Sequence, residues 1–141
     1  MLMDIKLRVE NLVKKYGTRN PKKICKFLKI KIIYSDLGNI KGIYKKVVTN
    51  KFIAINENLD EFCQKVVLAH ELGHAILHHS KEVQTLKDYD LFPSFSSQLE
   101  VEANIFAAEL LIDENIENEC IEFPKIDLSI LEQLKKLKKR G

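Results

Sequence analysis

The chain has 141 residues, of which 45% are hydrophobic and 30% charged, and its formal net charge is +3. This length and composition are typical of one globular domain with an apolar core. No apolar run approaches the roughly 20 residues that a membrane-spanning helix needs, and the first ten residues lack the apolar core of a signal peptide. We therefore expect a single domain over residues 1–141, located in the cytoplasm and not in a membrane.

Charge is distributed unevenly along the chain. Residues 1–51 contain 14 Lys/Arg and 3 Asp/Glu, whereas residues 52–134 contain 4 and 17. A basic first third could bind nucleic acid, but lysines without interleaved arginine and aromatic residues are more typical of a solvated surface, so direct nucleic-acid binding is not expected. The three cysteines, Cys25, Cys63 and Cys120, form no C-x-x-C pair and are expected to be reduced and mostly buried.

The first half of the chain predicts two helices and a small sheet. Residues 4–16 have apolar side chains at helical spacing and end at Gly17, and Asn20-Pro21 is typical of a helix start. From Ile30 the spacing changes to strand alternation, which predicts strands at residues 30–34, 42–48 and 52–55. A turn is expected at residues 36–39 and a hairpin turn at residues 49–51, giving an at least partly antiparallel sheet.

The next element carries the most informative motif, His70-Glu71-Leu72-Gly73-His74. Asp60 can cap a helix that continues to Leu77, and residues four apart lie on the same face of a helix. His70 and His74 can therefore bind one metal ion, and Glu71 is close enough to take a proton from an attacking water and pass it to a leaving amine. H-E-x-x-H at this place predicts a zinc peptidase, whereas two core histidines would leave Glu71 buried without a partner.

The second half of the chain predicts a loop and two further helices. Residues 80–97 are rich in Asp, Ser and Pro, and we expect a long loop or a lid there. Residues 98–112 are helical in pattern, and the spacing at residues 127–139 predicts a final amphipathic helix. No repeat and no second domain is indicated.

A catalytic zinc site usually has three protein ligands, so one more is required. His78 is about 12 Å along the helix from His70, too far for the two to bind one ion. Glu100 and Glu102 remain, about 200° apart around their helix, so only one can face the metal. Glu100 is favoured because Asn104 follows it at i+4 and could hydrogen-bond a ligating histidine.

His70-Glu-Leu-Gly-His74-Ala-Ile-Leu-His78, followed by Glu100-x-Glu-Ala-Asn-x-Phe-Ala-Ala-Glu-Leu-Leu111, resembles the ImmA/IrrE family of metallopeptidases. The resemblance covers about residues 4–114. It implies an α+β, compact zincin-like fold (a minimal gluzincin): N-terminal helices, a mixed or antiparallel sheet of about three strands, and an HExxH helix followed by a glutamate helix. In the family pattern the glutamate two residues before Ala-Asn is the ligand, which corresponds to Glu100.

The resemblance also implies a function. Members of the ImmA-like branch, encoded on phages and integrative elements, cleave a helix-turn-helix repressor, and the absence of further downstream domains favours this branch over the IrrE-like one. Leu111-Ile112-Asp113 departs from the frequent Leu-Met-Pro ending of the second motif. We therefore expect a zinc endopeptidase with His70, His74 and Glu100 as ligands of one Zn²⁺ and Glu71 as general base.

The alternative is a metal-containing module that sequesters a repressor without cutting it. Its closed site would use His78 or Glu102 as a fourth ligand. Tyr89 and His78 are candidates for an additional oxyanion donor.

Overall fold

A computed structural model describes residues 4–77, 84–87, 98–112 and 136, the backbone alone for 84–87. The elements follow the order α1 (Ile5–Tyr16), α2 (Pro21–Phe27), β1 (Lys31–Ser35), β2 (Ile40–Val47), β3 (Asn50–Asn56), α3 (Glu61–Leu77), β4 (Gln84–Lys87) and α4 (Gln98–Leu111). This confirms the predicted α+β class, with N-terminal helices, a small mixed sheet, and an HExxH helix followed by a glutamate helix. Cys120 and, apart from residue 136, the helix predicted at residues 127–139 lie outside the described residues.

The first two helices begin and end where their capping residues predict. The carboxylate of Asp4 accepts a hydrogen bond from the Leu7 amide (3.0 Å), and Gly17 ends α1 with a φ of 69°. The side chain of Asn20 accepts hydrogen bonds from the amides of Lys22 and Lys23 at the start of α2. Each cap satisfies backbone groups that a helix end leaves without partners, which is why sequence located these boundaries well.

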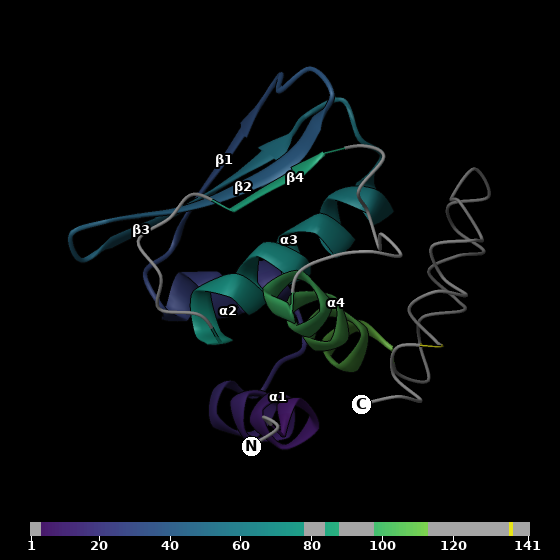
Figure 1. The fold of residues 1–141 in the computed structure, drawn as a ribbon. Coiled ribbons are helices and arrows are strands. Elements are labelled where there is room, and N and C mark those ends of the chain that lie inside the picture. The colour runs from purple at the N-terminus through teal and green to yellow at the C-terminus, as the bar shows by residue number, and fades with distance from the viewer. Residues whose placement is uncertain (1–3, 78–83, 88–97, 113–135, 137–141) are drawn as a thin grey trace.

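The strands form one mixed sheet in the order β1-β3-β2-β4. β1 pairs with β3 in parallel, and β2 pairs antiparallel with both β3 and β4. Side chains alternate across the sheet, so Gly42 and Tyr44 of β2 share the buried face with Ile53 and Ile55 of β3. The described helices lie on this face of the sheet (Figure 1).

The hairpin turn lies earlier than predicted. Val47 pairs with Asn50, so the turn consists of Val48 and Thr49, and the residues predicted as its second half, Asn50 and Lys51, belong to β3. A shift of pairing by one residue would turn the apolar side chains of a strand to its other face. Burial of the inner face therefore fixes the register, and Val48 takes a positive φ of 55° although Asn50 is the better residue for it.

The expectation of a loop throughout residues 80–97 was wrong for Gln84–Lys87. This segment is β4, and it pairs antiparallel with β2, so the sheet has a fourth strand beyond the three predicted. Its residues show no strand-like alternation of apolar and polar types. Backbone pairing along β2 forms the strand without such a pattern. The rest of the predicted loop lies outside the described residues.

Helix α3 lies between the sheet and α4 and forms the centre of the core (Figure 1). Its side chains from Val66 to Ala75 are all buried. Cys25 and Cys63 are also buried, as predicted, and burial raises the pKa of the Cys25 thiol to about 12. None of the helices in the described part of the chain is both long and apolar enough to cross a bilayer.

The conformation of Val48 leads to a stability prediction. A β-branched residue at positive φ is strained, typically by about 1 kcal/mol or more, and glycine has no such penalty. Val48 is 79% exposed, so its side chain contributes little burial. We expect Val48→Gly to raise the free energy of unfolding by about 1 kcal/mol in chemical denaturation. Thr49→Gly, at a neighbouring position without positive φ, is the control and should lower it; equal effects of the two changes would contradict this account.

Candidate metal centre

The histidines of the H-E-x-x-H motif lie on a fixed, buried stretch of α3. The Asp60 carboxylate accepts a hydrogen bond from the Cys63 amide (2.8 Å) and caps the helix one turn before the core begins. His70, Glu71 and His74 each have a relative exposure of 0%. The two imidazoles lie 4.8 Å apart between ring centroids and almost perpendicular, at 82°. A helical spacing of four thus places two ring nitrogens on one side of the helix.

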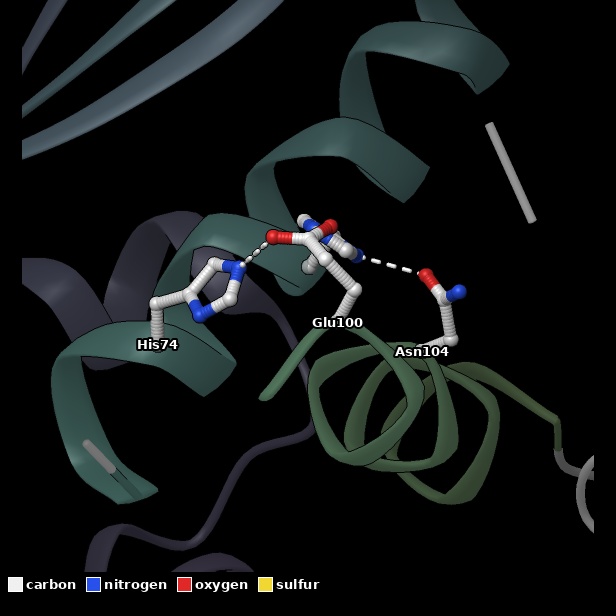
Figure 2. A network of polar contacts seen from close by, with 4 residues as sticks. His74, Glu100 and Asn104 are labelled. Atoms are coloured by element: carbon white, nitrogen blue, oxygen red, sulfur yellow. Dashed lines mark hydrogen bonds and ion pairs between the residues drawn. The ribbon is translucent and has the colours of Figure 1, made fainter. Parts of the chain in front are cut away.

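Helix α4 brings a carboxylate to both imidazoles. Glu100 Oε1 lies 2.9 Å from His74 Nε2, and Glu100 Oε2 lies 3.1 Å from His70 Nε2. Figure 2 shows Glu100 extending from α4 toward His74 on α3. Burial alone would raise the pKa of Glu100, but the hydrogen bonds and charges of the two histidines outweigh it and hold that pKa well below its usual range.

Asn104 orients one of the histidines from the opposite side. Its side-chain oxygen lies 2.7 Å from Nδ1 of His70, one turn along α4 from Glu100 (Figure 2). The contact that the sequence suggested between Asn104 and a histidine of the motif is therefore present. An amide oxygen is an acceptor, so Nδ1 of His70 donates to it, which leaves Nε2 as the ring nitrogen that can bind a metal ion.

These donors fit a metal ion. With the proton on Nδ1, the lone pair of His70 Nε2 faces a carboxylate oxygen, and two acceptors at 3.1 Å require a cation or a second proton between them. Nitrogen and carboxylate ligands about 2.1 Å from a tetrahedral zinc ion stand about 3.4 Å from one another, close to the separations seen here. The chemistry of the set and its spacing are those of a two-histidine, one-carboxylate site.

Glu71 lies beside this set and is fully buried. Neither of its carboxylate oxygens has a hydrogen-bond partner among the described residues. One ligand atom from each of His70, Glu71 and His74 lies within 4.8 Å of the others. Burial raises the pKa of Glu71 well above its usual value, and the negative charge of Glu100 adds to the effect. A cation at the imidazoles would reverse this effect by stabilising the carboxylate.

The other candidate residues are placed differently or not described. Glu102 is half-buried on another side of α4, where the Gln98 side-chain amide donates to its carboxylate (3.4 Å). The structure therefore brings Glu100, and not Glu102, to the two imidazoles. His78 and Tyr89 lie outside the described residues. Tyr44, which sequence reasoning did not single out, has a buried hydroxyl with no hydrogen-bond partner in the described part of the chain, and burial raises its pKa.

Close contact between α3 and α4 sets the distance from Glu100 to the histidines. A β-carbon on Gly73 would lie 3.1 Å from both Cβ and Cδ1 of the buried Phe106. Ala103, Ala107 and Ala108, whose small side chains allow close packing, are all buried. Sequence reasoning did not assign a role to Gly73; a glycine within an apolar helix is the signal of such an approach.

Two arginines near the N-terminus bind the C-terminal ends of the helices that carry the site. The guanidinium of Arg8 donates to the carbonyl oxygen of Ile76 at the end of α3 (3.2 Å). The guanidinium of Arg19 donates to the carbonyl oxygens of Glu109 and Leu110 at the end of α4 (3.0 and 3.2 Å). Cations at helix C-termini satisfy free carbonyl groups and oppose the negative end of the dipole.

Comparison with known proteins agrees with this geometry. The model of peptidase family M78, the IrrE N-terminal-like domain, matches residues 25–137. The chain belongs to this family. Together with the His-Glu-His cluster on α3, membership makes it a metallopeptidase, as the resemblance predicted.

Two known proteins align with most of this chain. It is 38% identical over 130 residues to an uncharacterized immunity region protein 2 of Bacillus phage phi105, which covers 90% of this chain and 81% of the relative. It is 37% identical over 121 residues to the metallopeptidase ImmA of Bacillus subtilis strain 168, covering 84% of this chain and 69% of the relative.

The contact between Asn104 and His70 gives a first prediction for the site. Loss of a group that orients a ligating histidine typically lowers metal affinity by about 10- to 100-fold. We expect Asn104→Ala to weaken Zn²⁺ binding by that factor in a competition titration with a chromophoric chelator. Asn104→Asp keeps an oxygen acceptor and should remain close to wild type. Equal affinity of Asn104→Ala and wild type would show that Asn104 does not orient the ring.

The packing of Gly73 on Phe106 gives a second prediction for the site. Gly→Ala in a helix normally favours folding by about 1 kcal/mol, but here the added methyl group would push α4 away and move Glu100 from the histidines. We expect Gly73→Ala to lower Zn²⁺ affinity by about tenfold, in the range seen when ligand-supporting groups are lost. Gly17→Ala, at a glycine with nothing near its Cα, is the control for added bulk. Its Zn²⁺ affinity should equal wild type even where the strained φ lowers its stability. A Gly73→Ala variant with wild-type affinity would contradict the packing argument.

Proposed function

We propose that this M78 peptidase is a zinc-dependent endopeptidase that cleaves a helix-turn-helix repressor of a phage or mobile element. The observation that carries the proposal is the meeting of His70, His74 and Glu100 beside a fully buried Glu71. The ligand set and the role of Glu71 are part of the proposal. A structural metal site would not need a buried carboxylate that lacks partners among the described residues.

In the proposed reaction the protein supplies ligands and a base. His70, His74 and Glu100 would hold Zn²⁺, which polarises a peptide carbonyl and lowers the pKa of a water. Glu71 takes the proton of the attacking water and then donates it to the amine that leaves as the peptide bond breaks. Because burial excludes bulk solvent around Glu71, the proton that Glu71 takes from the water passes to the leaving amine and not to bulk solvent.

The sheet supports a binding mode for the peptide. β1 and β4 are the edges of the described sheet, and β4 contacts α3. We propose that an extended substrate segment adds alongside β4 as a further strand, with its backbone held by main-chain hydrogen bonds. Such binding selects an extended segment more than a specific side chain, so the substrate must expose a linker or unfold locally.

The class of substrate rests on the relatives. One is named as a phage immunity region protein and the other as the metallopeptidase ImmA. Phage immunity depends on repressors, and the resemblance to ImmA-like proteins implies a helix-turn-helix repressor as the target. A DNA-binding substrate places the reaction in the cytoplasm.

The proposal is tested by incubating the protein with purified helix-turn-helix phage repressors and following their cleavage. Wild type, Glu71→Gln and Glu61→Gln are each loaded with Zn²⁺, their metal content is measured, and the products are identified by mass spectrometry. Glu61 is exposed in the first turn of the same helix and serves as the matched control. We expect Glu71→Gln to keep its zinc and to lose at least about 100-fold in kcat, the usual contribution of a general base.

The outcomes separate the candidate functions. Cleavage by wild type and Glu61→Gln, without cleavage by zinc-loaded Glu71→Gln, supports the peptidase. Tight binding of the repressor by all three proteins without cleavage would overturn it in favour of a module that sequesters the repressor.

A further inference from the structure

Strand β2 approaches α3 unusually closely at one residue, Gly42. A β-carbon at this position would lie 2.5 Å from Cγ1 of Val67, 3.3 Å from the carbonyl oxygen of Ala54, and 3.4 Å from Cγ of Glu71. The first of these separations is far shorter than two carbon atoms tolerate. Only glycine therefore allows the strand to lie at this distance from the helix.

The same residue lies at an irregularity of the sheet. Ile40 pairs with Lys87 and Gly42 with Leu86, so β2 has one more residue than β4 in this stretch, and Lys41 is the extra residue. A bulge of this kind bends a strand locally and re-aims its neighbours, and bulges are common next to active sites. The bend and the missing side chain occur together at the point that faces Glu71.

We propose that Gly42 is a positioning residue for Glu71. The proposal rests on the function proposed above, in which Glu71 is the general base. Val67 and Glu71 are four residues apart and lie on one face of α3, and that face packs against the backbone of β2 at Gly42. The backbone of β2 thus packs against the side chain of Glu71. His70 and His74 face α4 on another side of the helix.

This arrangement separates two tasks on one helix. The α4 side of α3 gathers the proposed metal ligands, and the β2 side fixes the direction of the base. Neither carboxylate oxygen of Glu71 has a hydrogen-bond partner among the described residues, so its direction depends on packing, to which the backbone of β2 at Gly42 contributes. A change at Gly42 should therefore alter the base without altering the metal ligands.

The experiment compares Gly42→Ala, Val67→Ala and the double variant. Gly42→Ala should lower kcat by about tenfold or more, because small misplacement of a catalytic group costs up to about 100-fold. KM and Zn²⁺ affinity should stay within about twofold of wild type. Val67→Ala removes the atom nearest the new methyl group, so the double variant should recover the kcat of Val67→Ala alone.

The control is Ile43→Val. Ile43 follows Gly42 in β2 but lies on the opposite face of the sheet, so this change perturbs the strand without touching α3. It should leave kcat unchanged. If Gly42→Ala does not fold, the double variant and Gly42→Val in the Val67→Ala background replace it, and kcat should be lower with valine at position 42 than with alanine. A folded Gly42→Ala with wild-type kcat, or equal losses of kcat and Zn²⁺ affinity, would overturn the proposal.

A second measurement does not depend on cleavage. Crystal structures of wild type and Gly42→Ala with Zn²⁺ should show the Glu71 carboxylate displaced while the distances among His70, His74 and Glu100 are kept. An unmoved Glu71 would overturn the positioning role even if the peptidase is active. If wild type proves inactive but Glu71 moves as expected, the proposed function fails and the structural inference holds.

Discussion

The contact of one carboxylate with two imidazoles is the interaction on which the arrangement of the helices depends. Glu100 lies within 3.1 Å of Nε2 of both His70 and His74, and each pair crosses from α4 to α3. Two fully buried imidazoles and a partly buried carboxylate carry a desolvation penalty unless a cation or protons compensate it. The small residues that line this contact, Gly73 above all, let the two helices come close enough for that compensation.

The buried general-base candidate imposes a second constraint. A carboxylate such as Glu71, in a site with 0% exposure, is unstable as an anion until a positive charge lies nearby. A metal ion bound at the two histidines would stabilise the Glu71 carboxylate, so metal binding would favour the form of Glu71 that accepts a proton. The sheet contributes by direct contact, since the Gly42 backbone lies against the helix turn that carries Glu71.

The N-terminal region contacts the two helices that carry the site. Arg8 and Arg19 lie before the part of the chain that the family model matches, yet they bind the final carbonyl groups of α3 and α4. These contacts hold the ends of both site helices. The orientation of Glu100 relative to the histidines thus rests on residues from the whole described chain, and not only on the two motifs.

The sequence by itself determined the local features of this protein. The signals at Gly17 and Asn20-Pro21 located helix boundaries, and the H-E-x-x-H spacing placed two histidines on one helix face, because these signals act within a few residues. It also indicated the pairing of Asn104 with a histidine, through the i+4 relation of Asn104 to Glu100.

Tertiary structure alone decided the non-local features. The hairpin turn lies at Val48 and Thr49, earlier than predicted, because burial of the inner sheet face fixes the register. Strand β4 forms from a segment without a strand pattern because its backbone pairs with that of β2. The close approaches at Gly42 and Gly73 depend on elements far apart in the sequence. No local pattern encodes which atoms a missing β-carbon would meet, since that depends on how the layers pack.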